Sequence, residues 1–335
     1  MLNYATGDGF SFTPTSTQLL IALPLLLGLV CTATWLSTTL RFHYTVVGSK
    51  LQSQKPTAPS PPLTLPYALP WLGSALSFLN QNPGSFWRYL SQRVLGPSDL
   101  TAITILLGGN KTHVVTSAHA IQGLFKTRNV SRDRFNRQIA QNALGASKDD
   151  TERMFPHETG KSERHEKDEM DVLNHDFLLS QTAVNSLTGK FIEVFQQALH
   201  ADEDLVDWRT VDLVDWLKHR MFTASVTALM GSKILEMNPK LAEQYWEFDA
   251  TLLTRFYGVP RMLQPRAYQV LDDMLEETQL WVEYVLAECR GNPPLAPEWE
   301  PLFGAKVMRA RHQFYIREGL SVQGKASFDL GFLFG

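Results

Sequence analysis

Residues 60–78 read SPPLTLPYALPWLGSALSF, and Pro59 stands directly before them. Five prolines stiffen this part of the chain: Pro59, Pro61, Pro62, Pro66 and Pro70. Because proline fixes φ near −65° and lacks a backbone donor, we expect extended, polyproline-like backbone that forms a semi-rigid spacer. Apolar side chains suited to packing on a core stand between the prolines: Leu63, Leu65, Tyr67, Leu69, Trp71 and Leu72. This apolar content favours a spacer that docks on a folded domain over an ordinary proline-rich linker, which is the alternative.

The segment before the prolines is long and uncharged. No charged residue occurs between Asp8 and Arg41, and its most apolar part, LLIALPLLLGLVCTATWLS, spans residues 19–37. About 20 apolar residues in a helix cross a bilayer core, so the length predicts a transmembrane helix. A cleaved signal peptide is the weaker interpretation, because it would begin with positive charge and only Asp8 precedes this segment.

Positive charge follows the apolar segment and does not precede it. Arg41, Lys50 and Lys55 lie after it, so the positive-inside rule places the C-terminal bulk in the cytosol. Two sequons, Asn110-Lys111-Thr112 and Asn129-Val130-Ser131, would then be chance matches, whereas in the opposite orientation they could be glycosylated.

The composition is that of a globular protein with no strong preference for a charged partner. The chain has 335 residues, 44% hydrophobic and 19% charged, with a formal net charge of −3. A basic surface for phosphate is not indicated, so we expect no nucleic-acid partner. The only two cysteines, Cys31 and Cys289, exclude a disulfide framework and a cysteine-based zinc site within this sequence.

A small sheet is predicted after a short helix at residues 82–96. The β-branched runs 103–107 and 113–116 flank Gly108-Gly109, which indicates a hairpin, and Ser117 can cap a helix that continues to Phe125.

Residues 148–171 contain fourteen Asp, Glu, Lys or Arg side chains in twenty-four positions. Such a composition predicts a solvated charged loop or a locally disordered insert. A metal site is the alternative, since His157, His165 and His175 occur in or near this segment, but no His-Glu-x-x-His spacing exists there.

Helical periodicity dominates the rest of the chain, most regularly from Pro265 onward. Val270, Met274, Trp281, Val285 and Cys289 share one face, which predicts a core helix with Cys289 as a small buried apolar residue.

Together these segments resemble a cytochrome P-450, a haem-thiolate monooxygenase, of the fungal membrane-bound kind. The resemblance covers the anchor, the proline stretch with LPYALPWLGSALSFLNQNPGSFWRYL, the strand pair at Gly108-Gly109, and later runs such as NPKLAEQYWEFD, FYGVPR and LFGAKVMRARHQFYIREGLSVQGKASFDLGFLFG. The order and spacing of these segments are most similar to those of the branch that includes steroid 7-alpha-hydroxylases, prostacyclin synthases and fungal secondary-metabolite oxidases. The resemblance implies a mainly α fold with a small β-sheet, forming the N-terminal portion of the cytochrome P-450 fold behind one transmembrane helix.

The same resemblance implies haem, iron, O2, a lipophilic secondary-metabolite or sterol-like substrate, electrons from an NADPH-dependent reductase, and the endoplasmic reticulum membrane. Its haem ligand is a cysteine that follows a Phe-x-x-Gly sequence. Phe328-Asp329-Leu330-Gly331 has that first half, but no cysteine follows it in this sequence, and Cys289 lacks the glycine-rich approach. A Glu-x-x-Arg pair does not occur either. The nine histidines are expected in loops and on polar helix faces, which opposes histidine ligation.

The predicted organisation is therefore a membrane anchor at 1–40, a basic and proline-rich hinge at 41–72, and an incomplete monooxygenase-like domain at 73–335 that contains the charged loop 148–171. The resemblance implies a truncation before the oxygen-binding helix and the haem-cysteine loop, hence a chain inactive alone. No residue is assigned as catalytic, cofactor-binding or metal-ligating. Possible channel residues, Phe222, Phe256, Tyr257 and Met262, are equally good core residues, and we expect the core for each of them. The alternative is a membrane-anchored helical scaffold or interaction protein, and a hydrolase is disfavoured because no Gly-x-Ser-x-Gly elbow is present.

Overall fold

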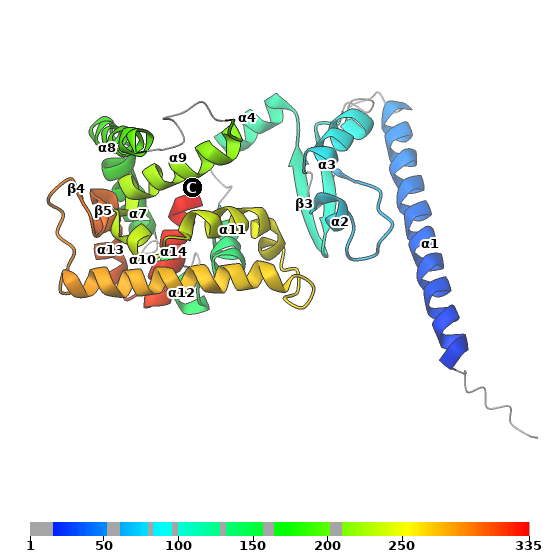
Figure 1. Ribbon diagram of the computed structural model, residues 1–335. Helices are drawn as coiled ribbons and strands as arrows, with labels where there is room; N and C mark the ends of the chain where they lie inside the picture. Colours follow the sequence, from blue (N-terminus) through cyan, green and yellow to red (C-terminus); the bar gives the residue numbers. More distant parts are fainter. Residues whose placement is uncertain are drawn as a thin grey trace, which may run out of the picture. The chain divides into compact units, whose positions relative to one another are not determined.

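The computed structural model describes residues 16–51, 61–79, 83–95, 100–127, 132–156, 164–201 and 210–334. It divides into an N-terminal unit, Met1–Val130, and a C-terminal unit, Ser131–Gly335. Helices predominate, and the strands form one three-stranded and one two-stranded sheet, which confirms the predicted mainly α class with a small sheet (Figure 1). Some signals predicted from sequence, at Asn82, Gly96 and Asn129, lie outside the described residues.

The N-terminal unit combines one long helix with a small sheet and short helices. Its elements are α1 (Ser16–Leu51), β1 (Leu63–Thr64), α2 (Ala75–Phe78), α3 (Pro83–Tyr89), the π-helical turn η1 (Leu90–Leu95), β2 (Ala102–Leu107), β3 (Asn110–Val115) and α4 (Ala118–Lys126).

The sheet has the order β1-β2-β3, with β1 parallel to β2 and β3 antiparallel to it. The hairpin turns at Gly108 and Gly109, whose φ angles of 55° and 84° are left-handed and favour glycine. Ser117 caps α4 by accepting a hydrogen bond from the backbone N–H of Ala120. The predicted hairpin and cap are thereby confirmed, because the β-branched runs and the glycine pair specify them locally.

The proline stretch supplies the edge strand of this sheet. Leu65 is 2% exposed, and its backbone N–H donates to the Thr104 carbonyl at 2.8 Å. Trp71 differs from the prediction: it is 64% exposed, with its backbone at φ 63°. Its ring lies over Gly109, where a Cβ would meet the indole, so packing on the hairpin turn replaces burial in the core.

Helix α1 contains one stretch, Ala22–Val46, that is long and apolar enough to cross a membrane, with a mean hydropathy of 1.6. None of this stretch is buried within the chain. The helix continues to Leu51, past residue 40, and residues 52–60 lie outside the described part of the chain.

The C-terminal unit is built from helices. Its elements are α5 (Asp133–Gln138), η2 (Ile139–Ala143), α6 (Lys148–Met154), α7 (Arg164–Asn174), η3 (His175–Leu179), α8 (Gln181–His200), α9 (Leu213–Met230), α10 (Lys233–Met237), α11 (Leu241–Phe256), α12 (Pro265–Glu288), β4 (Trp299–Glu300), β5 (Gly304–Ala305), α13 (Lys306–Arg317) and α14 (Val322–Phe334), of which η2 and η3 are π-helical.

Helix α12, the long helix along the lower edge of this unit in Figure 1, packs against α11 and α14. The predicted stripe is buried, with Met274, Trp281 and Val285 all 0% exposed. Trp281 also donates its indole N–H to the Leu302 carbonyl at 3.2 Å, so its polar end is satisfied inside the core.

Arg255 joins three elements of the unit although it is 0% exposed. Its guanidinium donates to the carbonyls of Ala143 at 3.2 Å and Ala267 at 2.9 Å, and to the Thr251 hydroxyl at 2.6 Å. Burial lowers the pKa of Arg255 to about 10, which still leaves it charged at neutral pH. A buried guanidinium satisfied by neutral oxygens fixes η2 and α12 against α11.

Part of the predicted charged loop at 148–171 is helical, which corrects that prediction. Helix α6 covers Lys148–Met154 and α7 begins at Arg164, while residues 157–163 lie outside the described part of the chain. Ser147 caps α6, and Asp150, 3% exposed, reaches Ser321 across the unit. Composition alone does not predict this helix, because a buried aspartate with hydrogen-bond partners cannot be told from a solvated aspartate by sequence.

Candidate functional site

An apolar cavity lies between α9 and α11 of the C-terminal unit, with Leu333 of α14 at its edge. It encloses about 950 Å³, part of it open to solvent. Phe222, Tyr245 and Trp246 supply aromatic walls, and Lys218 lies over the Trp246 ring at 5.3 Å from its centroid. Burial, with the nearby Asp249, raises the pKa of Tyr245, so its hydroxyl stays protonated and donates to the Leu333 carbonyl at 3.4 Å. The cavity can accept an apolar group, but it holds no acid–base pair.

The four residues considered as channel candidates are not brought together at one site. Phe222 is 7% exposed and lines the cavity. Phe256 and Tyr257 are half-buried and pack on each other with ring centroids 4.8 Å apart. Met262 is 86% exposed, so the expectation that it belongs to the core is wrong.

Cys289 occupies the C-terminal cap of α12, where its thiol is half-buried and faces the Leu286 carbonyl at 3.5 Å. Burial raises the pKa of Cys289. The C-terminal end of a helix carries partial negative charge, which also opposes a thiolate. A haem-thiolate ligand must be deprotonated, so this cysteine does not fit that role. Packing of Cys289 against the core cluster agrees with the predicted structural role.

The Phe-x-x-Gly sequence at residues 328–331 lies inside α14 and forms no loop. Phe328 is 5% exposed and stacks edge-on with Phe155 at 6.0 Å. A Cβ at Gly331 would come within 2.7 Å of the Leu144 side chain. Both residues thus have packing reasons for their identity, and the resemblance to the first half of a haem-cysteine loop is a coincidence of spacing.

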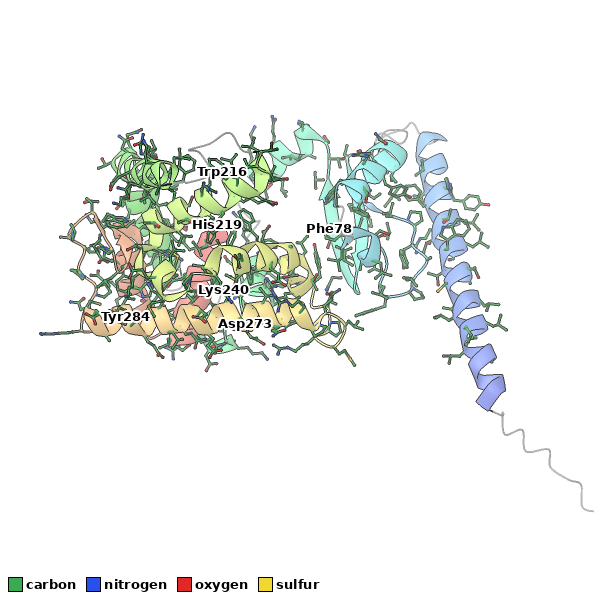
Figure 2. All side chains as sticks on the ribbon, in the orientation of Figure 1. Phe78, Trp216, His219, Lys240, Asp273 and Tyr284 are labelled. Carbon is green, nitrogen blue, oxygen red and sulfur yellow. The ribbon has the colours of Figure 1, made fainter. Side chains whose placement is uncertain are left out.

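A buried His–Asp pair joins α13 to α14. The Nε2 atom of His312 lies 2.7 Å from Oδ2 of Asp329, and both side chains are 0% exposed. The imidazole is enclosed by the rings of Trp281, Phe303 and Tyr315. This location corrects the expectation that all histidines occupy loops and polar helix faces, although His219, labelled on α9 in Figure 2, is exposed as expected.

The pair has no route to a ligand. Its remaining polar atoms, Nδ1 of His312 and Oδ1 of Asp329, have no hydrogen-bond partner, nor does the nearby buried hydroxyl of Ser327. Across the described residues, no three His, Cys, Asp or Glu side chains gather where they could hold a metal ion. The pair therefore serves to couple two helices, and its enclosed ring cannot present a free nitrogen to haem without rebuilding the core.

Sequence reasoning missed the pair because α13 reads as a polar helix. Arg309, Arg311 and His312 are all buried on it. The available signal was on α14: Asp329 is a single carboxylate inside an apolar run, and such a residue needs a buried polar partner.

Comparisons with known proteins identify relatives that share most of this chain. Cytochrome P450 monooxygenase efuG of Hormonema carpetanum is 26% identical over 316 residues, covering 91% of this chain and 52% of the relative. The monooxygenase calL of Penicillium decumbens is 25% identical over 78% of this chain and 52% of its own length. The monooxygenase fsoE of Humicola fuscoatra is 25% identical over 81% of this chain and 47% of its own length. The chain thus spans about half the length of the curated relatives it matches.

The solved structure of retinoic acid bound cyanobacterial CYP120A1 is 19% identical with a TM-score of 0.45, covering 78% of this chain and 56% of that one. No protein-family model matches the chain. On the three sequence matches, this chain is similar to cytochrome P450 monooxygenases over the part that it shares with them.

Proposed function

We propose that the chain forms the N-terminal, membrane-anchored half of a cytochrome P450 monooxygenase and does not hold haem by itself. The match to the curated monooxygenases carries this proposal, because it runs along 91% of this chain but only 52% of efuG. Such a chain would contribute the anchor, the small sheet and the helices of the first half of the fold, while the axial ligand would come from sequence outside these 335 residues.

The cysteines support the second part of the proposal. Haem-thiolate chemistry needs a cysteine thiolate that donates electron density to the iron. The raised pKa of Cys289 and its place at the C-terminal end of α12 oppose this role. Cys31 lies in α1, inside the candidate membrane span. The fit of this chain to haem is therefore poor.

The intact relatives would use haem, O2 and electrons from an NADPH-dependent reductase to hydroxylate a lipophilic, secondary-metabolite or sterol-like substrate. We place the chain in the endoplasmic reticulum membrane as a single-pass protein with its C-terminal bulk in the cytosol. Two observations support this proposal. The stretch Ala22–Val46 is long and apolar enough to cross a membrane, and positive charge occurs only toward its C-terminal end and beyond, beginning with Arg41.

The test is the haem content and turnover of the full 335-residue chain, expressed in microsomes with a haem precursor and a reductase. The expected result is no protein-bound porphyrin above background and no oxygenated product from a panel of sterols and terpenoids. The efuG relative, expressed in parallel, controls for haem supply. Stoichiometric porphyrin with turnover by the chain alone would contradict the proposal.

A membrane-anchored scaffold is the second candidate, and the self-contained core of the C-terminal unit favours it. Arg255, Asp150 and the His312–Asp329 pair each join helices of this unit by hydrogen bonds to partners that lie within the unit. Thermal unfolding of the full chain in lipid nanodiscs separates the two candidates. A sharp, reversible transition supports the scaffold, whereas a broad one with aggregation supports an incomplete monooxygenase, whose unmatched apolar surface recruits neighbours.

A further inference from the structure

A crevice in the N-terminal unit opens between the long helix α1 and the proline stretch. Its walls include Trp35 of α1, Tyr67 and Ala68 of the proline stretch, Leu76 of α2, and Tyr89 of α3. Its volume is about 520 Å³, within the size range of small-molecule sites, and it is partly open to solvent. Neither the P450 match nor the proposed function assigns a role to this crevice.

The crevice is held together by a side chain of α1. The backbone N–H of Tyr67 donates to the Thr38 hydroxyl at 3.2 Å, and the same hydroxyl lies 2.9 Å from the Tyr67 carbonyl. The hydroxyl proton is shared between that carbonyl and the Thr34 carbonyl of its own helix, also at 2.9 Å. This contact links residues 29 positions apart, so α1 is fastened to the edge of the sheet at this point.

The position of the crevice along α1 corresponds to the boundary of a bilayer. A hydrocarbon core takes about 20 helical residues, and counting from Ala22 such a core ends near Arg41, the first charged residue after Asp8. Trp35 and Thr38 lie just before that charge, in the zone where tryptophan is enriched at membrane interfaces. A crevice that opens beside them faces the interface, where the carbonyl ends of lipid acyl chains join the ester groups.

The lining has the chemistry of an amphiphile. The rim is apolar and open, with Trp35 52%, Leu76 62% and Tyr89 51% exposed. Deeper in, Leu65 and Phe86 are buried at 2% and 4%. The hydroxyls of Ser74 and Ser77 stand among these apolar groups. An ester-linked acyl chain would satisfy both kinds of surface, because its tail covers the apolar walls and its carbonyls can accept from hydroxyls.

We propose that this crevice binds one phospholipid of the surrounding bilayer, which seals α1 against the small sheet so that the anchor and the sheet move as one body. The proposal rests on the membrane anchor of the proposed function. It predicts a lipid that exchanges slowly, whereas a single helix surrounded by fluid lipid would hold none.

The experiment uses the full chain in phosphatidylcholine nanodiscs that contain phosphatidylcholine with a nitroxide near the end of one acyl chain. Electron paramagnetic resonance should show an immobilised component of about one lipid per chain, as expected for one site of this size. Ala68→Trp fills the crevice and should remove most of that component. Ala118→Trp, at an alanine on α4 that is also exposed but lies outside the crevice, is the matched control and should keep it.

The hydrogen-bonded contact between Thr38 and Tyr67 is tested separately. Thr38→Val removes the acceptor for the Tyr67 N–H and should reduce the immobilised component by about half or more, since a weaker contact lets the crevice open. Thr34→Val, one turn away, loses only a hydrogen bond within α1 and should leave the component unchanged.

The outcomes separate this inference from the proposed function. Flotation with vesicles reports the anchor alone, and failure to float would overturn both. Flotation without an immobilised lipid, or equal immobilised components in Ala68→Trp and Ala118→Trp, would overturn the lipid site and leave the anchor and the P450 assignment intact. Loss of the component by competition with a soluble sterol but not with excess phosphatidylcholine would also contradict it.

Discussion

Individual buried polar residues help to hold the C-terminal unit together alongside its apolar core. Asp150 accepts hydrogen bonds from the Ser321 backbone N–H at 2.8 Å and from the Ser321 hydroxyl at 2.7 Å, and it also contacts the Ser147 hydroxyl at 2.7 Å. One carboxylate thereby fastens the start of α14 to the start of α6, 171 positions apart. Hydrogen bonds to a charged group are the strong ones, so this residue has a large local effect.

Asp150→Asn should loosen the start of α14. Losing charge-assisted bonds costs about 1.5–3 kcal/mol, which corresponds to roughly a tenfold to hundredfold drop in hydrogen-exchange protection. The measurement is exchange at the backbone amides of Ser321 and Gly324 in the full chain. Asp149→Asn, an exposed neighbour on the same helix, is the control and should change nothing.

The same carboxylate makes this protection depend on pH. Burial alone would raise the pKa of Asp150, but the hydroxyls of Ser147 and Ser321, the Ser321 N–H and Arg153 together hold it below its ordinary value. Because the folded pKa is lower than the unfolded one of about 3.9, the carboxylate stabilises the fold above that value, and this contribution is lost as pH falls through the folded pKa. Protection in the wild-type chain should fall in that acid range, and Asp150→Asn should not show the same fall.

Removing one member of the buried His–Asp pair should be more damaging than removing an exposed carboxylate. Asp329→Ala leaves Nε2 of His312 buried and unpaired, at a cost of about 3–5 kcal/mol if the imidazole carries charge and about 1–3 kcal/mol if it is neutral. Limited proteolysis should show faster cleavage within α13 and α14. Asp273→Ala, on the exposed face of α12 (Figure 2), should leave the cleavage rate unchanged, and equal rates in both variants would refute the structural role of the pair.

Residue by residue, sequence patterns located apolar burial well and polar burial poorly. The stripe on α12 follows from helical spacing, because periodic apolar residues have few alternative positions. Asp150 and His312 were missed, since their burial depends on partners 171 and 17 positions away, and no local pattern encodes those contacts.

At the scale of elements, two glycines fix the contact between the end of α9 and strand β5. Gly231 ends α9 at φ 90°, and Gly304 begins β5 at φ 69°. A Cβ on either glycine would collide with the backbone of the other segment. These positions require glycine both for their backbone angle and for the close approach.

Gly231→Ala should therefore be costlier than an ordinary glycine substitution. With φ 90° and ψ 171°, Gly231 lies in a backbone region essentially restricted to glycine, so a side chain there costs about 1–3 kcal/mol, and forced overpacking adds about 1–3 kcal/mol. Gly258→Ala is the matched control: its φ is 68°, but nothing lies within 4 Å of the added Cβ, so it should carry the strain alone. Thermal denaturation of the two variants measures the difference, and equal destabilisation would contradict the close contact.

Elements with local start and stop signals were predicted correctly, and elements that depend on distant contacts were not. The hairpin at Gly108-Gly109 and the α4 cap at Ser117 both carry their signals within a few residues. From its sequence, helix α6 is taken for a charged loop because its two buried residues, Asp150 and Thr151, are polar. The small cavity-lining set could not be separated from the core, since both use aromatic and aliphatic residues.

For the whole molecule, membrane orientation can be read from the chain's own sequons. If the C-terminal bulk is cytosolic, Asn110 and Asn129 stay unmodified when the full chain is expressed in microsomes. Endoglycosidase treatment should then cause no shift in mobility. The positive control is a variant with a sequon added before residue 16, which should be glycosylated in this orientation. A mobility shift that depends on Asn110 would reverse the topology.

The similarity to cytochrome P450 monooxygenases and the poor fit of Cys289 to a haem thiolate also concern the whole molecule. The chain aligns along most of its own length with cytochrome P450 monooxygenases and along about half of theirs. Within it, Cys289 is a structural residue at the end of α12, and the 328–331 sequence is a helix. Our central proposal is that these 335 residues do not by themselves give iron a sulfur ligand.

The most direct test is the absorbance of the reduced, carbon monoxide-treated full chain in membranes supplied with haem, compared with efuG prepared in the same way. We predict a thiolate-haem band for efuG and none for this chain, with no difference between the wild type and Cys289→Ser. A band from this chain that disappears in Cys289→Ser would contradict the claim.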